Sequence, residues 1–197
     1  MVDNPQSEPS GDLSLSQQLL LAMPGKVTGS LANTVIYVCE HTDQGALGLV
    51  INRPTDLTVG DLLKRLDLPL SLEIGAREQA PVFFGGPVQT DRGFVLHMPG
   101  HGYGSSIRLG DIALTTSRDV LQDVAVGKGP EHMLITLGYA GWGAGQLEDE
   151  MSQNAWLNVS ATNQILFDMP PEKRYDAALA QLGIKSSVML SGDVGHA

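Results

Sequence analysis

Four glycines lie between an apolar run and an acidic stretch in the segment GYAGWGAGQLEDE. They are Gly138, Gly141, Gly143 and Gly145. In a phosphate-binding loop, backbone N–H groups between a strand and a helix surround the anion in this way. The segment lacks the Gly-Lys-Ser/Thr ending of such a loop, and its acidic residues 148–150 would repel an anion at the start of the helix. We therefore interpret the glycines as sites of tight turns and close packing beside Trp142, with nucleotide binding as the weaker alternative.

A second group of residues predicts a ligand pocket. Asn52 and Arg53 end one apolar run in polar groups, and Gly85 and Gly86 would let a ligand or another backbone approach closely. If the two strand ends meet, Arg53 offers a forked donor to a carboxylate or a phosphate. His97, which ends the run GFVLH, completes this candidate pocket. The alternative, which we favour, is that Arg53 bonds an internal carboxylate or backbone carbonyls and that the glycines bend the sheet.

No pattern in the sequence predicts a catalytic group, a cofactor or a metal. His97 and His101 are four residues apart, but the Pro-Gly pair between them prevents the helix that would place both on one face for zinc. The chain has no Cys-x-x-Cys, no His-Glu-x-x-His and no Gly-x-Ser-x-Gly motif. Glu148 and Glu150 are two residues apart, so on a helix they would point to different faces and could not share a substrate.

Cys39 is the one cysteine of the chain and lies in an apolar strand pattern. His41 would lie on the same side of an extended chain. A redox-sensing thiol would need exposure and a lowered pKa. Because free cysteines are among the most buried residues, we interpret Cys39 as a small core residue.

The charge balance argues against direct binding of nucleic acid. The chain carries 12 Lys and Arg against 22 Asp and Glu, for a net charge of -10. Affinity for nucleic acid requires clustered cations, which the sequence does not show. The polar residues 1–12 predict a disordered tail before one domain over residues 13–197. Without a signal peptide or a long apolar segment, we expect a cytoplasmic protein with no membrane partner.

The spacing of apolar residues predicts an α+β fold. Strands are expected at residues 34–40, 46–52, 81–86, 93–98, 112–116, 131–142 and 157–161. Helices are expected at residues 56–68, 118–126, 146–156 and 171–183. Thr58 is placed to cap the first helix, Pro54 is expected to end the second strand, and residues 13–25 fit either a short helix or an extended lead-in. Since strands and helices do not alternate regularly, we expect a mostly antiparallel or mixed sheet.

Several motifs resemble the bacterial YqgE/AlgH family and occur in its order. They are MPG (23–25), GLVINRP (48–54), FFGGPV (83–88), GFVLH (93–97) and GYAGWGAGQLEDE (138–150). The resemblance covers residues 13–190 and implies a strongly bent sheet that partly closes into a small barrel surrounded by helices. It implies no particular reaction. The family's label of transcriptional regulator rests on genetic association in alginate-producing bacteria.

Three classes of function follow. The favoured one is a non-catalytic regulatory binding module for a small ligand or a protein partner. The second is a transcriptional regulator that contacts DNA directly, which the acidic charge disfavours. The third is a nucleotide-handling enzyme that uses the segment from Gly138 to Gly145, which the missing catalytic motifs disfavour.

Overall fold

The computed structural model describes residues 14–185 and residue 190, so the expected tail at residues 1–12 lies outside the described residues. The strands are β1 (Gln18–Ala22), β2 (Val35–Thr42), β3 (Gly45–Val50), β4 (Pro54–Thr58), β5 (Pro81–Phe84), β6 (Val88–His97), β7 (Ser106–Leu109), β8 (Ile112–Thr115), β9 (Met133–Gly143) and β10 (Trp156–Ser160). The α-helices are α1 (Val59–Arg65), α2 (Asp119–Ala125), α3 (Gln146–Ser152) and α4 (Pro171–Ala180). Short 3-10 segments span Gly29–Leu31 and Leu72–Gln79, and a π-helical turn spans Gln164–Asp168.

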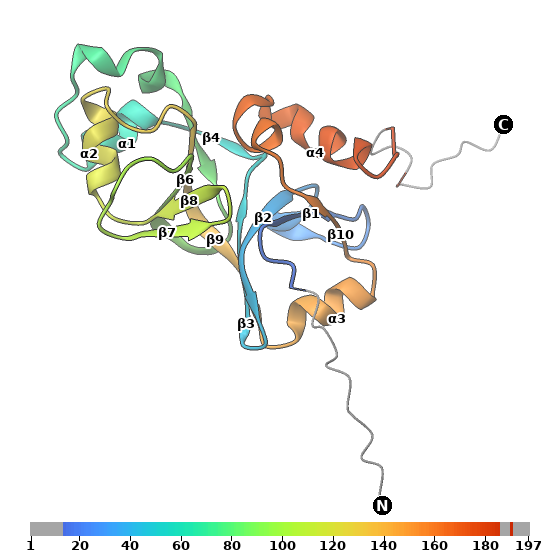
Figure 1. Ribbon diagram of the computed structural model, residues 1–197. Coiled ribbons are helices and arrows are strands. Elements are labelled where there is room, and N and C mark those ends of the chain that lie inside the picture. The colour runs from blue at the N-terminus through green and yellow to red at the C-terminus, as the bar shows by residue number, and fades with distance from the viewer. Residues whose placement is uncertain (1–13, 186–189, 191–197) are drawn as a thin grey trace, which may run out of the picture.

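The strands form one curled sheet in the order β10-β1-β2-β3-β9-β6-β8-β7, with β4 and β5 joined to the side of β9 (Figure 1). Every pairing is antiparallel except that of β5 with β9. The sheet curls into a half-barrel surrounded by helices. This confirms the expected α+β class with a strongly bent, mostly antiparallel sheet.

The sheet divides along β9, which belongs to two halves. Residues 133–137 and Tyr139 of β9 pair with β6, and Thr136 and Leu137 also pair with β5. Residues 140–143 pair with β3. As a result α1 and α2 lie with β6, β7 and β8, whereas α3 and α4 lie with β1, β2 and β10 (Figure 1).

Three glycines allow the backbones to meet at the point of division. A Cβ at Gly86 would lie 2.0 Å from the carbonyl carbon of Tyr139, and one at Gly85 would lie 2.3 Å from the oxygen of Gly138. Gly138 itself has a φ of +78°, which favours glycine, and its added Cβ would lie 2.2 Å from the oxygen of Gly86. The glycines of FFGGP therefore serve a close approach between β9 and the β5–β6 connection.

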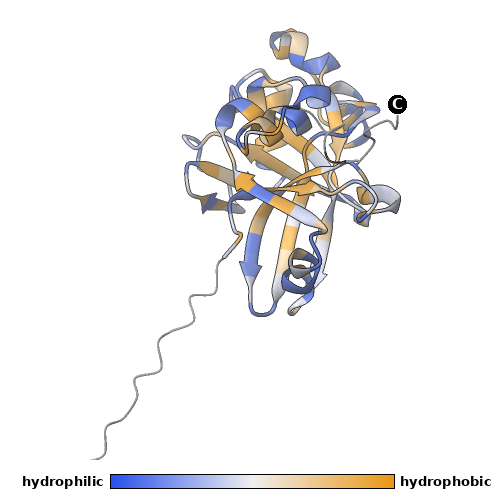
Figure 2. Cartoon of the chain, turned by 90° about the vertical axis from the view of Figure 1, so that its right-hand side faces the viewer, coloured by the Kyte–Doolittle hydropathy of each residue, from blue (hydrophilic) through white to orange (hydrophobic). Residues whose placement is uncertain are grey.

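The core consists of three groups of buried side chains. One group lies between the sheet and α4 and includes Tyr37 and Leu179, and a second holds α1 and α2 against β5, β6 and β9. The third, which includes Trp142 and Trp156, is covered by α3. Figure 2 shows the hydrophobic residues gathered along the strands in the middle of the molecule. Both faces of β2 are covered, since Tyr37 and Val38 belong to different groups, and this explains its continuous apolar run.

The structure corrects the sequence prediction around Pro54. The second strand of the hairpin already ends at Val50, and Pro54 begins a separate strand, β4, which pairs with β5. A proline is tolerated as the first residue of a strand because it need not donate to the ladder there. The first helix therefore begins at Val59 rather than at residue 56. Residues 13–25, which fitted either a helix or an extended segment, contain the strand β1.

Thr58 caps α1 as predicted, because its hydroxyl oxygen accepts a hydrogen bond from the backbone N–H of Asp61 at 3.1 Å. We expect Thr58→Ala to lower the free energy of unfolding by about 1 kcal/mol through loss of this bond. Thr58→Ser keeps the hydroxyl and should stay within about 0.5 kcal/mol of the original protein. Urea unfolding followed by circular dichroism measures both, and equal losses in the two variants would contradict the capping role.

Candidate functional site

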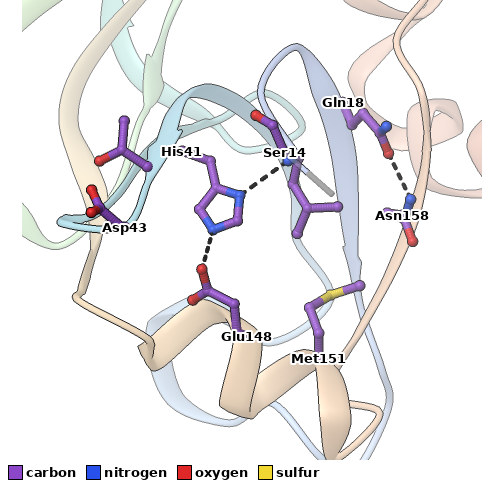
Figure 3. A pocket seen from close by; sticks show the side chains of 9 residues that line it. Ser14, Gln18, His41, Asp43, Glu148, Met151 and Asn158 are labelled. Carbon is purple, nitrogen blue, oxygen red and sulfur yellow. Dashed lines mark hydrogen bonds and ion pairs between the residues drawn. The ribbon is translucent and has the colours of Figure 1, made fainter. Parts of the chain in front are cut away.

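A cavity of about 380 Å³ opens where the end of β2 meets α3 (Figure 3). Its wall is completed by the residues that precede β1, by Gln18 of β1 and by Asn158 of β10. The pairing register of the strands explains the position of this cavity. Gly45, at the start of β3, lies opposite Gly143, so the β2–β3 turn is brought beside the first turn of α3.

His41 is held between two partners in the cavity wall. The backbone N–H of Leu15 donates to Nδ1 at 3.0 Å, so Nδ1 is an acceptor. The ring hydrogen is therefore on Nε2, which donates to Oε1 of Glu148 at 2.7 Å (Figure 3). The side chain of His41 is 6% exposed, and that of Glu148 is 48% exposed. Both ring nitrogens are engaged, so the imidazole fixes the position of Glu148 and has no free lone pair for a substrate proton.

The charge of this cavity is negative. Its lining carboxylates are Asp43 and Glu148, and no lysine or arginine lines it in the part of the chain that the structure describes. The backbone N–H of Glu148 and the hydrogen bond from His41 lower the pKa of the Glu148 carboxyl. A carboxyl with a lowered pKa stays ionised at neutral pH, so a negative charge is fixed at the mouth of the cavity.

The remaining wall offers amide groups and apolar surface. Nδ2 of Asn158 donates to Oε1 of Gln18 at 2.6 Å (Figure 3). This bond orients both amides and leaves the Gln18 amide nitrogen and the Asn158 amide oxygen as polar groups for a ligand. Leu15 and Met151 supply apolar contact. Such a mixture of apolar surface with a few oriented polar groups is typical of small-molecule sites.

The structure brings four of the five predicted pocket residues together and engages their polar groups. Asn52 Oδ1 accepts from the backbone N–H of Val35 at 2.8 Å. Arg53 donates through Nη1 to the carbonyl of Ser30 and through Nη2 to that of Ala32, the latter at 2.7 Å. These hydrogen bonds hold the segment before β2 in place. They agree with the favoured interpretation that Arg53 bonds backbone carbonyls.

The two glycines of this group pack on β9, while His97 lies elsewhere. The carbonyl of Gly85 accepts a hydrogen bond from the backbone N–H of Val50, and its N–H donates to the carbonyl of Leu137. His97 lies opposite Met133, whereas Val88, near the glycines, lies opposite Tyr139. Six positions along β9 correspond to about 20 Å, so the strand β6 carries His97 away from the other four residues. Binding of a ligand at Asn52, Arg53, Gly85 and Gly86 stays a prediction.

His97 itself is fully buried, with 0% exposure. Its Nδ1 donates to the carbonyl of Met98 at 2.8 Å, and its Nε2 lies 2.7 Å from Oγ1 of Thr115. Burial lowers the pKa of His97, because the charged imidazolium would lose its hydration. The neutral ring is thus a core group bonded on both sides.

The glycine-rich segment is a paired strand over most of its length. Gly138, Gly141 and Gly143 belong to β9, and the last two lie opposite Leu47 and Gly45 of β3. Gly145 stands at the N-cap of α3 with a φ of +74°. Trp142 is 6% exposed and belongs to the third core group. The open loop that a phosphate-binding site would need between strand and helix is therefore reduced to a two-residue connection, which supports the turn-and-packing interpretation.

Glu148 and Glu150 point to different faces of α3, as predicted. Glu148 contacts His41, whereas Oε2 of Glu150 accepts hydrogen bonds from the indole N–H groups of Trp142 and Trp156, each at 2.8 Å. The interpretation of Cys39 as a core residue is also confirmed. It is 4% exposed, and burial raises the pKa of its thiol above the ordinary value.

Sequence reasoning missed the cavity at His41. Although His41 lies two residues after Cys39, nothing in the sequence connects it with Glu148, which is 107 positions away. The polar residues Gln18 of β1 and Asn158 of β10 belong to no motif. Their single signal is their position in or beside apolar strands, where a polar side chain must find a partner or face solvent.

Comparison with known proteins gives consistent matches over nearly the full chain. Residues 19–187 match the family described as AlgH-like. A UPF0301 protein of Bordetella petrii is 66% identical over 99% of this chain and 94% of its own length, and one of Burkholderia ambifaria is 54% identical over 97% and 100%. The solution structure of the AlgH protein from Pseudomonas aeruginosa matches with a TM-score of 0.76 and 48% identity, over 98% of this chain and 100% of that one. A crystal structure of a protein from Corynebacterium diphtheriae, 17% identical, shares the fold with a TM-score of 0.67 over 97% and 94%.

No helix within residues 14–185 is long and apolar enough to cross a membrane.

Proposed function

This chain belongs to the AlgH-like family, and we propose that it is a non-catalytic binding module that takes a small cationic ligand in the cavity at His41. The observation that carries the proposal is the negative lining of that cavity, which holds two carboxylates and no lysine or arginine among the described residues. A cationic group would neutralise this charge, whereas an anion would be repelled.

Different residues of the wall recognise the charged part and the apolar part of such a ligand. Glu148, fixed by His41, offers its exposed carboxylate oxygen to an ammonium group, and Asp43 adds a second negative charge. Leu15 and Met151 contact the apolar body of the ligand. A volume of about 380 Å³ lies near the lower end of the roughly 300–1,000 Å³ that small-molecule pockets span, which favours a small ligand.

The state of the one imidazole in this wall supports binding rather than acid–base catalysis by histidine. A general base needs a free lone pair within reach of the proton that it removes. Nδ1 of His41 already accepts from Leu15, and Nε2 already donates to Glu148. Direct contact with DNA and nucleotide chemistry stay predictions of the sequence, and the negative charge of this cavity gives them no support.

The test is a titration of the ¹⁵N-labelled protein with hexylammonium, and with hexanol as the uncharged ligand of the same length. We expect hexylammonium to shift the amide signals of Gln18, His41 and Glu148, and to bind at least about tenfold more tightly than hexanol. Glu148→Gln keeps an acceptor for His41 but removes the charge, and should weaken hexylammonium binding by about tenfold.

The matched control is Asp149→Asn, which removes a neighbouring charge on α3 that does not line the cavity. It should change the affinity by no more than about twofold, since an exposed carboxylate that does not line the cavity interacts only weakly with a charge inside it. Equal binding of hexanol, or equal losses in the two variants, would overturn the proposal.

A further inference from the structure

Arg174 on α4 is a buried positive charge. It is 4% exposed and is the one charged residue among the buried polar residues of the described chain. Its Nε donates to the carbonyl of Met169 at 2.9 Å, and its Nη1 donates to the carbonyl of Ile51. The guanidinium carbon lies 5.2 Å from the centre of the Phe83 ring. These contacts fix the side chain without neutralising it.

No carboxylate of the described residues forms an ion pair with Arg174. Within residues 14–185, the carboxylates of Glu148, Glu78 and Asp168 pair with His41, Lys64 and His132. A guanidinium has five N–H donors, and the two carbonyls use two of them. A buried charge is costly in free energy, and the Glu172 carboxylate, which favours the charged form of Arg174, offsets part of this cost. The burial lowers the pKa of Arg174 to about 10, because the charged form is desolvated.

A cavity of about 280 Å³ lies beside this guanidinium. Phe83 and Met169, which hold the guanidinium, both line the cavity, so the charge sits in its wall. The rest of the lining is mostly apolar and includes Met133 and Phe167. The carboxylate that lines it belongs to Asp168, whose side chain is 57% exposed and paired with His132 at 3.3 Å.

We propose that this cavity is a second ligand site, which takes a small monocarboxylate with an apolar body and pairs its carboxylate with Arg174. One guanidinium neutralises one negative charge, and its remaining N–H groups match the two oxygens of a carboxylate. A phosphate monoester, with up to two negative charges, would leave a net charge in an apolar cavity. The site shares no lining residue with the cavity at His41 and prefers the opposite charge.

The experiment is a calorimetric titration of the full chain with octanoate, octanol and octyl phosphate. We expect octanoate to bind at least about tenfold more tightly than either of the others, because a charge-assisted hydrogen bond contributes more than one to a neutral group. Octanoate labelled with ¹³C at the carboxyl carbon should also show a shifted signal in the bound state. Equal binding of octanol would overturn the role of the charge, and equal binding of octyl phosphate would overturn the choice of a carboxylate.

Two variants test the place of binding. Arg174→Lys keeps the charge but removes the paired N–H donors of the guanidinium. It should weaken the binding of octanoate by about tenfold. Its control is Arg53→Lys, since Arg53 also bonds two backbone carbonyls but does not line this cavity, and it should leave the affinity within about twofold.

Should Arg174→Lys fail to fold, Ala80→Leu fills part of the cavity while Arg174 is kept. This variant should weaken the binding of octanoate by about tenfold and leave the binding of hexylammonium unchanged. The two titrations therefore test the cavity at Arg174 and the cavity at His41 separately. No octanoate binding up to about 10 mM, or unchanged affinity in a folded Ala80→Leu protein, would overturn the proposal.

Discussion

Gly86→Ala is expected to lower the free energy of unfolding by more than about 4 kcal/mol, a large part of the roughly 5–15 kcal/mol that keeps a domain folded. The added Cβ would lie 2.0 Å from the carbonyl carbon of Tyr139 and 2.2 Å from its oxygen. Both atoms belong to the backbone of β9, so no side chain can rotate away to make room. The φ of +152° at Gly86 adds strain for any residue with a side chain. Circular dichroism and urea unfolding measure the loss.

The matched control is Gly93→Ala, at a glycine within β6 that also lies beside β9. Its added Cβ would meet nothing closer than Cδ2 of Leu137 at 3.9 Å, which is an ordinary contact. We expect the free energy of unfolding to change by less than about 1 kcal/mol. A Gly86→Ala protein as stable as Gly93→Ala would contradict the view that these glycines allow the sheet to divide.

Glu150→Ala is expected to cost about 3 kcal/mol of unfolding free energy. Oε2 of Glu150 accepts from the indole N–H groups of both Trp142 and Trp156, and these side chains are 6% and 3% exposed. Removal of the carboxylate leaves two buried donors without an acceptor, at about 1–3 kcal/mol each. The two rings meet edge to face, with centroids 5.9 Å apart, so their packing would change as well.

Tryptophan fluorescence is a direct readout of this cluster, because the chain has two tryptophans and both belong to it. The emission of Glu150→Ala should shift in the folded state, and its urea midpoint should fall. The control Asp149→Ala removes an exposed carboxylate of the same helix and should leave the emission unchanged, with a stability loss below about 0.5 kcal/mol. A normal midpoint and emission for Glu150→Ala would show that the indole groups find other acceptors.

The sequence predicted the elements whose signals are local. The hairpin of β2 and β3 follows from two apolar runs joined by a polar turn, and α1 follows from leucine spacing with Thr58 before it. β4 was missed because its residues are mostly polar and exposed. β7 was missed because its alternation of polar and apolar residues covers only the four residues SIRL. The curl of the sheet was expected from a family resemblance rather than from periodicity, since curvature arises from contacts between distant strands.

The candidate sites were less predictable than the fold. His41 and Glu148 meet because β3 and β9 pair in one particular register, with Gly45 opposite Gly143. Arg174 reaches the wall of its cavity because the fold brings its side chain over Phe83 of β5, and its partner carbonyl at Ile51 lies 123 positions away. Side chains that meet only through tertiary pairing leave no spacing that a single sequence can show.

Because β9 pairs with both halves of the sheet, the protein cannot complete its sheet until β9 has been synthesised. Neither half of the sheet is complete without β9, since its residues 133–137 join β6 and its residues 140–143 join β3. The outer pair β1 and β10 joins Gln18 to Ser160, so the last strand closes against the first. A nascent chain that ends before residue 133 leaves the edges of β3 and β6 unpaired, and such edges are prone to aggregation. Because these contacts join residues far apart in the sequence, we expect folding to be slow. We also expect it to wait until almost the whole chain has left the ribosome.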